Sequence, residues 1–131
     1  MSARAGGCLC GAVRFRAQGP LRPVVVCHCG MCQRWHGGPG PYTNAGAGAL
    51  DIVEGRGLRW FRSSDAAERG FCAECGSSLF WRRVGSDAWS IAAGALEPPT
   101  GLETVLHIYV DDKPDYYRIA DGLPQKPGTS A

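Results

Sequence analysis

The chain has 131 residues, of which 44% are hydrophobic, and a formal net charge of +2 at pH 7. This length is typical of one domain with a modest core, so a second domain is not expected. No segment approaches the roughly 20 apolar residues that a transmembrane helix needs, which argues against a membrane protein. The 19 glycines and 9 prolines instead predict many short strands joined by tight turns.

The start of the chain does not resemble a secretory signal. Met1–Gly7 is small and polar, contains Arg4 and lacks an apolar core. We therefore expect a cytoplasmic, reducing setting, in which clustered cysteines bind metal more often than they pair. Disulfides, redox-active thiols and inert buried thiols are the alternatives, although the seven cysteines cannot all pair within one chain.

The first cysteine pair, Cys8 and Cys10, precedes an alternating pattern with Val13 and Phe15 that predicts a strand. Side chains at positions i and i+2 of a strand share one face. Both thiols are therefore expected to reach a single metal ion.

The second group places Cys27, Cys29 and Cys32 in one short turn, directly after the apolar run Val24–Val26, which predicts a strand. The glycine- and proline-rich residues 37–41 then predict a loop. Such a loop can shape access to a site formed by the three cysteines, or it can be an ordinary surface turn.

The third group, Cys72 and Cys75, predicts a tight knuckle followed by Gly76, which can adopt the left-handed conformation that such a turn needs. Just before it, Ser64–Arg69 begins with a possible serine cap and predicts a brief helical turn. Other runs rich in β-branched and aromatic residues predict strands. These runs are Leu58–Phe61, Ser78–Trp81, Trp89–Ile91 and Val105–Val110.

The seven thiols divide most simply into two metal sites. The four-cysteine cluster comprises Cys8, Cys10, Cys72 and Cys75, and the three-cysteine cluster comprises Cys27, Cys29 and Cys32. Thiolates are soft ligands that suit Zn²⁺, and four of them make a closed structural site, whereas three leave a position for water or a substrate thiol. The four-cysteine cluster would join segments about sixty residues apart and thereby staple a small core.

A histidine ligand would close the second site and make it structural. His28 lies between two ligands on an extended segment, so its side chain should point away from the metal. His36, four residues beyond Cys32, is the more plausible fourth ligand and is also a candidate general base. For His107 we expect a hydrogen-bonded residue on a strand.

The charge gives little support to nucleic-acid binding. Seven thiolates subtract seven charges from +2 and two Zn²⁺ ions add four, which leaves about −1 for the loaded protein. Arginines at alternate strand positions can form a basic face, but the interspersed acidic residues favour ordinary solvated faces. Arg34 and Arg69 are candidates either for a substrate carboxylate or for salt bridges, and Trp35 is a candidate wall of the open position.

The cysteine motifs lie in segments 7–15 (GCLCGAVRF), 27–34 (CHCGMCQR) and 69–77 (RGFCAECGS). Together with the C-terminal segments 107–117 and 121–125, they resemble the glutathione-dependent formaldehyde-activating family, whose domain also occurs in centromere protein V. The resemblance implies a structural zinc at the four-cysteine cluster and a labile catalytic zinc at the three-cysteine cluster. It also implies condensation of formaldehyde with glutathione to S-hydroxymethylglutathione, which is carbon–sulfur lyase chemistry in reverse.

We therefore predict an all-β protein, a small single-domain, zinc-stapled β-sheet of the β-tent kind with short loops and little helix. The domain is expected to span residues 1–125, and residues 126–131 are expected to form a disordered tail. Two Zn²⁺ ions per chain are expected, with Cys27, Cys29 and Cys32 as the catalytic site. The predicted function is that of a lyase or synthase acting on aldehyde–thiol adducts, with glutathione and formaldehyde as expected substrates. The alternative is a non-catalytic, zinc-stapled binding module for protein or nucleic acid.

Overall fold

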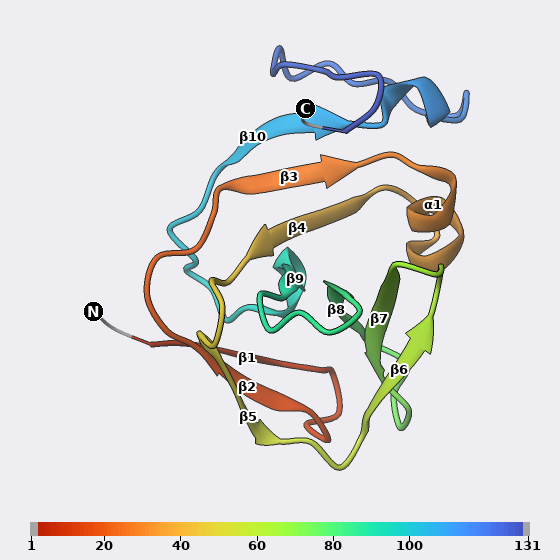
Figure 1. Ribbon diagram of the computed structural model, residues 1–131. Helices are drawn as coiled ribbons and strands as arrows, with labels where there is room; N and C mark the ends of the chain where they lie inside the picture. Colours follow the sequence, from red (N-terminus) through yellow and green to blue (C-terminus); the bar gives the residue numbers. More distant parts are fainter. Residues whose placement is uncertain (1–2, 130–131) are drawn as a thin grey trace.

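The computed structural model describes residues 3–129 and shows a mostly β protein with one short α-helix, as the sequence predicts (Figure 1). The strands form a three-stranded sheet in the order β1-β2-β5 and a seven-stranded sheet in the order β10-β3-β4-β9-β8-β7-β6. Residues 1–2 of the expected domain and 130–131 of the expected tail lie outside the described residues.

All strand pairs are antiparallel except the pair of β10 with β3, which is parallel. The smaller sheet contains β1 (Arg4–Gly7), β2 (Arg14–Ala17) and β5 (Leu50–Glu54). The larger sheet contains β3 (Val24–Cys27), β4 (Gly40–Asn44), β6 (Leu58–Arg62), β7 (Ala67–Cys72), β8 (Ser78–Arg83), β9 (Ser90–Ala92) and β10 (Thr104–Ile108). Two short 3₁₀ helices, Ala93–Ala95 and Val110–Asp112, follow β9 and β10.

The main core lies between the two sheets. Along β2 the side chains alternate between exposed and buried, which turns Phe15 and Ala17 inward. Phe15 meets Phe80 of β8 edge to face, with ring centroids 5.2 Å apart. Leu79 and Ile91 are fully buried beside this pair. The contact places the small sheet across one end of the large one.

The expected helical turn at Ser64–Arg69 is wrong. The Ser64 hydroxyl does accept bonds from the backbone N–H groups of Ala66 and Ala67, as a cap would. The chain then continues as β7, which pairs with β6 on one side and β8 on the other. Backbone pairing with two strands therefore prevails over a local cap signal.

The α-helix, α1 (Gly30–His36), occupies the segment that the sequence predicts as a short turn. Its N-cap is Cys29, whose sulfur accepts the Cys32 N–H at 3.3 Å. Its C-cap is Gly37 in the left-handed conformation, and the Gly37 N–H bonds to the Gln33 carbonyl. The expected loop at residues 37–41 is therefore short, because β4 already begins at Gly40.

The C-terminal segment follows β10 instead of leaving the domain at Lys126 (Figure 1). The Lys126 N–H donates to the His107 carbonyl at 2.9 Å, and the Tyr109 N–H donates to the Gly128 carbonyl at 2.8 Å. These backbone bonds hold the segment beside β10 as far as Gly128, where the sequence alone predicts disorder.

Candidate active site and metal centres

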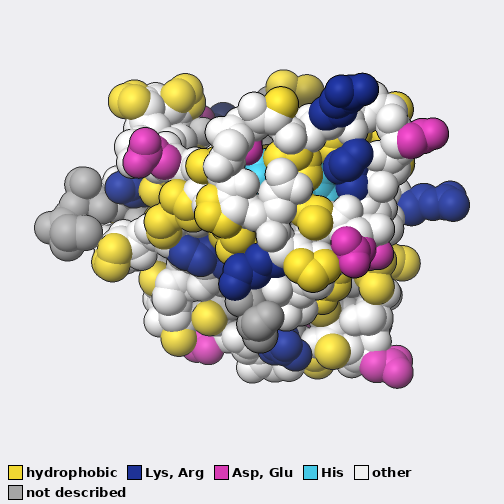
Figure 2. Space-filling view, turned by 90° about the horizontal axis from the view of Figure 1, so that it is seen from above, with side chains coloured by type: hydrophobic (Ala, Val, Ile, Leu, Met, Phe, Trp, Pro, Cys, Tyr) yellow, Lys and Arg dark blue, Asp and Glu magenta, His cyan; other side chains and the backbone are white. Residues whose placement is uncertain are grey.

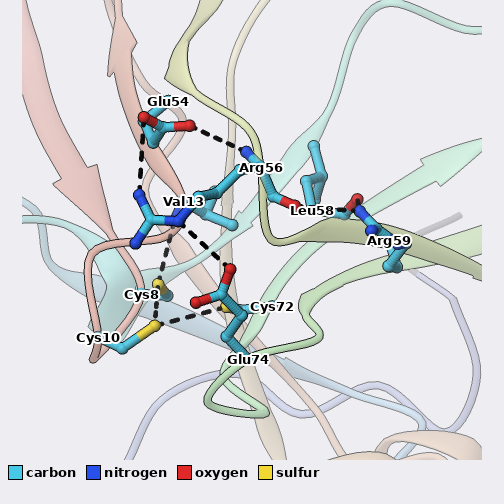
Figure 3. A network of polar contacts seen from close by, with 9 residues as sticks. All are labelled: Cys8, Cys10, Val13, Glu54, Arg56, Leu58, Arg59, Cys72 and Glu74. Atoms are coloured by element: carbon cyan, nitrogen blue, oxygen red, sulfur yellow. Dashed lines mark hydrogen bonds and ion pairs between the residues drawn. The ribbon is translucent and has the colours of Figure 1, made fainter.

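The four-cysteine cluster gathers two turns that are distant in sequence, and Figure 3 shows Cys8, Cys10 and Cys72 of this cluster. Its four sulfurs all lie within 4.8 Å of one another. The Cys10 sulfur is 3.7 Å from that of Cys8 and 3.8 Å from that of Cys72. Metal–sulfur bonds of about 2.3 Å in a tetrahedron require sulfurs about 3.8 Å apart, so the cluster fits a four-thiolate zinc ion.

Cys8 and Cys10 lie in the turn between β1 and β2, so the expectation that they share a strand face is wrong. The turn itself brings their sulfurs together. The Val13 N–H donates to the Cys8 sulfur at 3.2 Å, and the Cys8 N–H donates to the Val13 carbonyl at 3.0 Å. The extended pairing that a strand needs begins only at Arg14.

The second knuckle matches its prediction. Gly76 has φ of 83°, a left-handed conformation, and its N–H donates to the Cys72 carbonyl. The Ser77 side chain links both turns, since its hydroxyl accepts the Leu9 N–H and lies 3.2 Å from the Cys75 sulfur. The Ser77 hydrogen bonds lower the pKa of Cys75 to about 5, which favours the thiolate that a metal needs.

The three-cysteine cluster lies where β3 meets α1. Cys27 ends β3, Cys29 caps the helix and Cys32 occupies its first turn, and the three sulfurs lie within 4.8 Å of one another. Residues three apart at a helix start face the same side, which explains how Cys29 and Cys32 converge. The structure therefore brings together the three cysteines that the sequence groups.

Hydrogen bonds within this cluster favour a thiolate at Cys29. The Cys27 and Cys32 side chains bond to its sulfur and lower the pKa of Cys29 to about 2. The pKa of Cys27 is raised, and the largest cause is its hydrogen bond to Cys29. One thiolate is thus ready to bind a cation, and metal binding would displace the remaining thiol protons.

A cavity of about 540 Å³ opens directly onto the three-cysteine cluster, and all three cysteines line it. Its size lies in the range of about 300–1,000 Å³ that is usual for small-molecule sites. Tyr42, Trp81 and Ser90 from β4, β8 and β9 form another part of the wall. None of these three was identified from the sequence as a site residue, because only the pairing of distant strands brings them beside the cysteines.

A smaller cavity of about 400 Å³ adjoins the first one and shares Gly30, Met31, Ser63 and Arg69 with it. The candidates Arg34 and Trp35 line this second cavity only. Trp35 donates to the Ser78 hydroxyl and stacks on Phe61, so it does not wall the cysteine position directly. The face seen from above in Figure 2 shows Lys and Arg side chains beside a group of hydrophobic ones.

Arg69 is the candidate arginine that reaches the cysteines. Its side chain is buried, and both terminal nitrogens lie 3.8 Å from the Cys32 sulfur. A positive charge at this position favours thiolates in the cluster.

No histidine within residues 3–129 joins the three sulfurs as a ligand. His28 is buried and bonds to the Tyr117 hydroxyl at 2.7 Å and to His107 at 2.9 Å. His36 bonds instead to the Tyr42 hydroxyl at 2.7 Å. The alternative in which a histidine closes the second site is therefore not supported by the geometry.

His107 lies on β10 and is hydrogen-bonded, as the sequence predicts. Its partners, which the sequence does not indicate, are His28 and, at 2.8 Å, Asp121. The resulting chain runs from Asp121 through the two histidines to Tyr117, which also accepts a bond from Gln33 of α1. It ties the loop between Cys27 and Cys29 to the C-terminal segment. The sequence motifs did not indicate this support, because its members are far apart in the chain.

The family of glutathione-dependent formaldehyde-activating enzymes matches this chain over residues 3–112. The chain belongs to this family. A lyase of Schizosaccharomyces pombe, described as uncharacterized, is 28% identical over 117 residues, which cover 88% of this chain and 85% of the relative. A Halomonas elongata protein with the provisional name of glutathione-dependent formaldehyde-activating enzyme is 31% identical and covers 87% of this chain and 79% of its own.

The fold also has a solved counterpart. The crystal structure of a Rhodobacter sphaeroides protein superposes with a TM-score of 0.59 at 23% identity, covering 76% of this chain and 97% of that one. At this identity the similarity concerns the fold alone.

In the described part of the chain, no helix combines the length and apolar character that crossing a bilayer requires.

Proposed function

We propose that the protein is a zinc-dependent carbon–sulfur lyase or synthase that forms and cleaves adducts of an aldehyde with a thiol. Glutathione and formaldehyde are the expected pair, in line with the family description. The observation that carries this proposal is the difference between the two clusters. Four thiols surround one site, whereas the other has three thiols and faces a cavity large enough for a small molecule.

The donor sets agree with this division of roles. Four sulfurs at tetrahedral spacing would hold a structural zinc ion, and Cys27, Cys29 and Cys32 would hold a labile one. A zinc ion at the second site would supply Lewis acidity and a place for an exchangeable sulfur ligand. Thiolate ligation also agrees with the expected reducing, cytoplasmic setting.

The reaction itself needs little from the protein beyond position and a hydrogen bond. In the forward direction the thiol sulfur forms a bond to the aldehyde carbon, the carbonyl π electrons move to oxygen, and the thiol proton ends on that oxygen. The reverse direction breaks the same carbon–sulfur bond. Holding both reactants in one cavity next to the cysteines would lower the entropic part of the barrier.

Tyr42 is the residue best placed to assist the aldehyde oxygen. It lines the cavity, packs against Cys32 and bonds to His36. Burial raises the pKa of Tyr42 to about 12, so its hydroxyl stays protonated and can donate to an oxygen that gains negative charge. Burial also lowers the pKa of His36, which we assign as the residue that orients Tyr42 rather than as a metal ligand.

Native mass spectrometry tests the metal part of this proposal. We expect two zinc ions per chain, one of which a mild chelator removes while the protein stays folded, and a glutathione adduct when that zinc is present. Cys32→Ser should lose the labile zinc and the adduct, whereas Ser86→Ala, between β8 and β9 and in the wall of neither cavity, serves as the control. Two inert zinc ions would support the binding-module alternative instead.

Exchange spectroscopy by NMR tests the chemical part. The loaded protein should accelerate the interconversion of free glutathione, formaldehyde and S-hydroxymethylglutathione over its spontaneous rate. Tyr42→Phe should reduce this acceleration by about 10- to 1,000-fold if the hydroxyl stabilises the developing oxyanion. A wild-type protein that binds two zinc ions but gives no acceleration with any aldehyde and thiol would exclude the proposed activity.

A further inference from the structure

Arg69 is a buried cation that has no carboxylate partner in the part of the chain that the structure describes. Its side chain is only 4% exposed, and the ion pairs between residues 3 and 129 involve Arg56, Arg82 and His107 instead. Its Nε is buried without a hydrogen-bond partner. A buried charge is costly unless something compensates it, so its surroundings must account for its position.

The backbone holds Arg69 firmly against the three-cysteine cluster. It lies on β7, where it pairs with Phe61 of β6 on one side and Trp81 of β8 on the other. Both Nη atoms then reach 3.8 Å from the Cys32 sulfur. The side chain lines both cavities, so its charge sits at their common wall.

The other charged residues of the larger cavity are less well placed to act on the cysteines. Arg22 uses a terminal nitrogen to bond the Tyr42 carbonyl at 3.0 Å. Arg83 and Asp112 line the cavity but are exposed. Solvent screens exposed charges strongly, whereas a buried charge near sulfur is screened much less.

The charges of a loaded site explain what Arg69 would favour. Three thiolates and one divalent ion carry a single negative charge, which Arg69 neutralises. A neutral fourth ligand leaves this balance unchanged, whereas a fourth thiolate adds a negative charge that a nearby guanidinium stabilises. Arg69 should therefore act more strongly on the choice of fourth ligand than on the binding of the metal.

We propose that Arg69 is the specificity-determining residue that makes the fourth position of the three-cysteine cluster selective for anionic sulfur ligands, irrespective of the charge on the rest of the ligand. This inference rests on the proposed function, because it requires a metal-loaded cluster that accepts a thiol. It names the substrate class as low-molecular-weight thiols in general, including thiols without a carboxylate. It also separates Arg69 from the other role expected for it, the pairing with a substrate carboxylate.

Thiol binding to the cobalt-loaded protein tests the proposal without measuring turnover. Sulfur-to-cobalt charge-transfer absorption reports each added thiolate ligand, while the closed four-cysteine cluster gives a constant background. Glutathione carries carboxylates, cysteamine carries none, and imidazole is a neutral ligand. We expect Arg69→Met to weaken the binding of both thiols by about 10-fold or more and the binding of imidazole by less than about 3-fold.

Two further variants complete the experiment. Arg69→Lys keeps the charge and should bind both thiols within about 5-fold of the wild type, which also tests the proposal if Arg69→Met does not fold. Arg16→Met alters an exposed arginine of β2 that lines neither cavity and should leave thiol binding unchanged. Weaker binding of glutathione alone, or equal binding of all ligands by Arg69→Met and wild type, would overturn the proposal. A wild-type protein that binds neither thiol would instead overturn the proposed function.

Discussion

The two cysteine clusters use the same ligand chemistry but are built in different ways. The four-cysteine cluster joins the turn after β1 to the turn after β7, so its sulfurs come from two segments that meet only in the folded protein. The three-cysteine cluster comes from one short segment at the end of β3 and the start of α1. Closure by distant segments serves stability, whereas a local cluster beside a cavity leaves one side free for a ligand.

The surroundings of the clusters differ in the same sense. Around the first cluster, Arg56 forms ion pairs with Glu54 and Glu74 on the surface (Figure 3), and these cysteines line neither of the two cavities described above. Around the second, the buried Arg69 is the charged side chain whose nitrogens reach a cysteine sulfur. Exposed ion pairs contribute little to stability, so we expect the first cluster to depend on a bound metal ion. For the second cluster we propose that a buried charge, which solvent screens only weakly, acts on the sulfurs.

Replacing one cysteine in each cluster should give the largest contrast. Cys72→Ser removes a fully buried ligand that ends β7, and we expect the midpoint of thermal unfolding to fall by about 10 °C or more, because a structural zinc contributes folding free energy directly. Cys32→Ser should shift this midpoint by less than about 3 °C but abolish thiol binding. Calorimetry on both zinc-loaded variants checks this, and equal destabilisation would contradict the division of roles.

Adding one methyl group near the closed cluster should have the next largest effect. A Cβ at Gly57 would lie 2.8 Å from the Cys72 sulfur and 2.8 Å from the Ala12 Cβ. Gly57→Ala should therefore lower the free energy of unfolding by about 1–3 kcal/mol through overpacking, as measured by urea denaturation. Gly46→Ala is the matched control, since a Cβ there meets no atom within 4 Å. Equal stability of the two variants would show that Cys72 and Ala12 can shift to accommodate the added methyl group.

Removing one hydroxyl should loosen the open cluster without affecting the closed one. The Tyr117 hydroxyl bonds to His28, which lies between two of the cysteines, and to Gln33. Tyr117→Phe leaves a nitrogen of the buried His28 without this partner, at a cost of about 1–3 kcal/mol.

The labile zinc should then bind about 10-fold more weakly to Tyr117→Phe in a chelator competition, while the zinc ion at the four-cysteine cluster is retained. Tyr116→Phe provides the control, because its exposed hydroxyl bonds only to Gln33 among the contacts found. If both variants bind zinc like the wild type, the hydrogen-bonded chain does not position the cluster.

The smallest expected effect is a change of stability in acid, and it concerns Asp121 at the other end of the series of hydrogen bonds that begins at Tyr117. The hydrogen bond from His107 holds the pKa of Asp121 below its usual value of 3.8. A carboxylate with a depressed pKa in the folded state stabilises the protein above its unfolded pKa, and this contribution is lost as the pH falls through the folded value.

The stability difference between wild type and Asp121→Asn should accordingly be constant at neutral pH and shrink below about pH 4. Urea denaturation of metal-free protein at several pH values measures it, with the exposed Asp115→Asn as the comparison. A difference that does not change in acid would mean that the His107 bond contributes no stability.

Local patterns predicted much of the fold. Val24–Val26, Leu58–Phe61, Ser78–Trp81 and Val105–Val110 all fall mainly on strands, because β-branched and aromatic residues suit a pleated, half-buried surface. Predictions failed where a weak local signal met long-range pairing, as at Ser64–Arg69, which leads into β7. The helix α1 escaped prediction because its cap is a cysteine and its seven residues are too few for a clear period.

The sequence by itself determined the ligand chemistry: which thiols are close in the chain, how seven divide into four and three, and which family the motifs indicate. Spacing along the chain groups the thiols within each motif, since residues two or three apart must lie near one another. The division into four and three was predicted because a closed zinc site needs four ligands. Only the tertiary structure decided which cluster faces a cavity, which histidines stand apart from the sulfurs, and that Arg69 reaches Cys32. These features depend on the register and order of strands distant in sequence, which backbone pairing and core packing determine together.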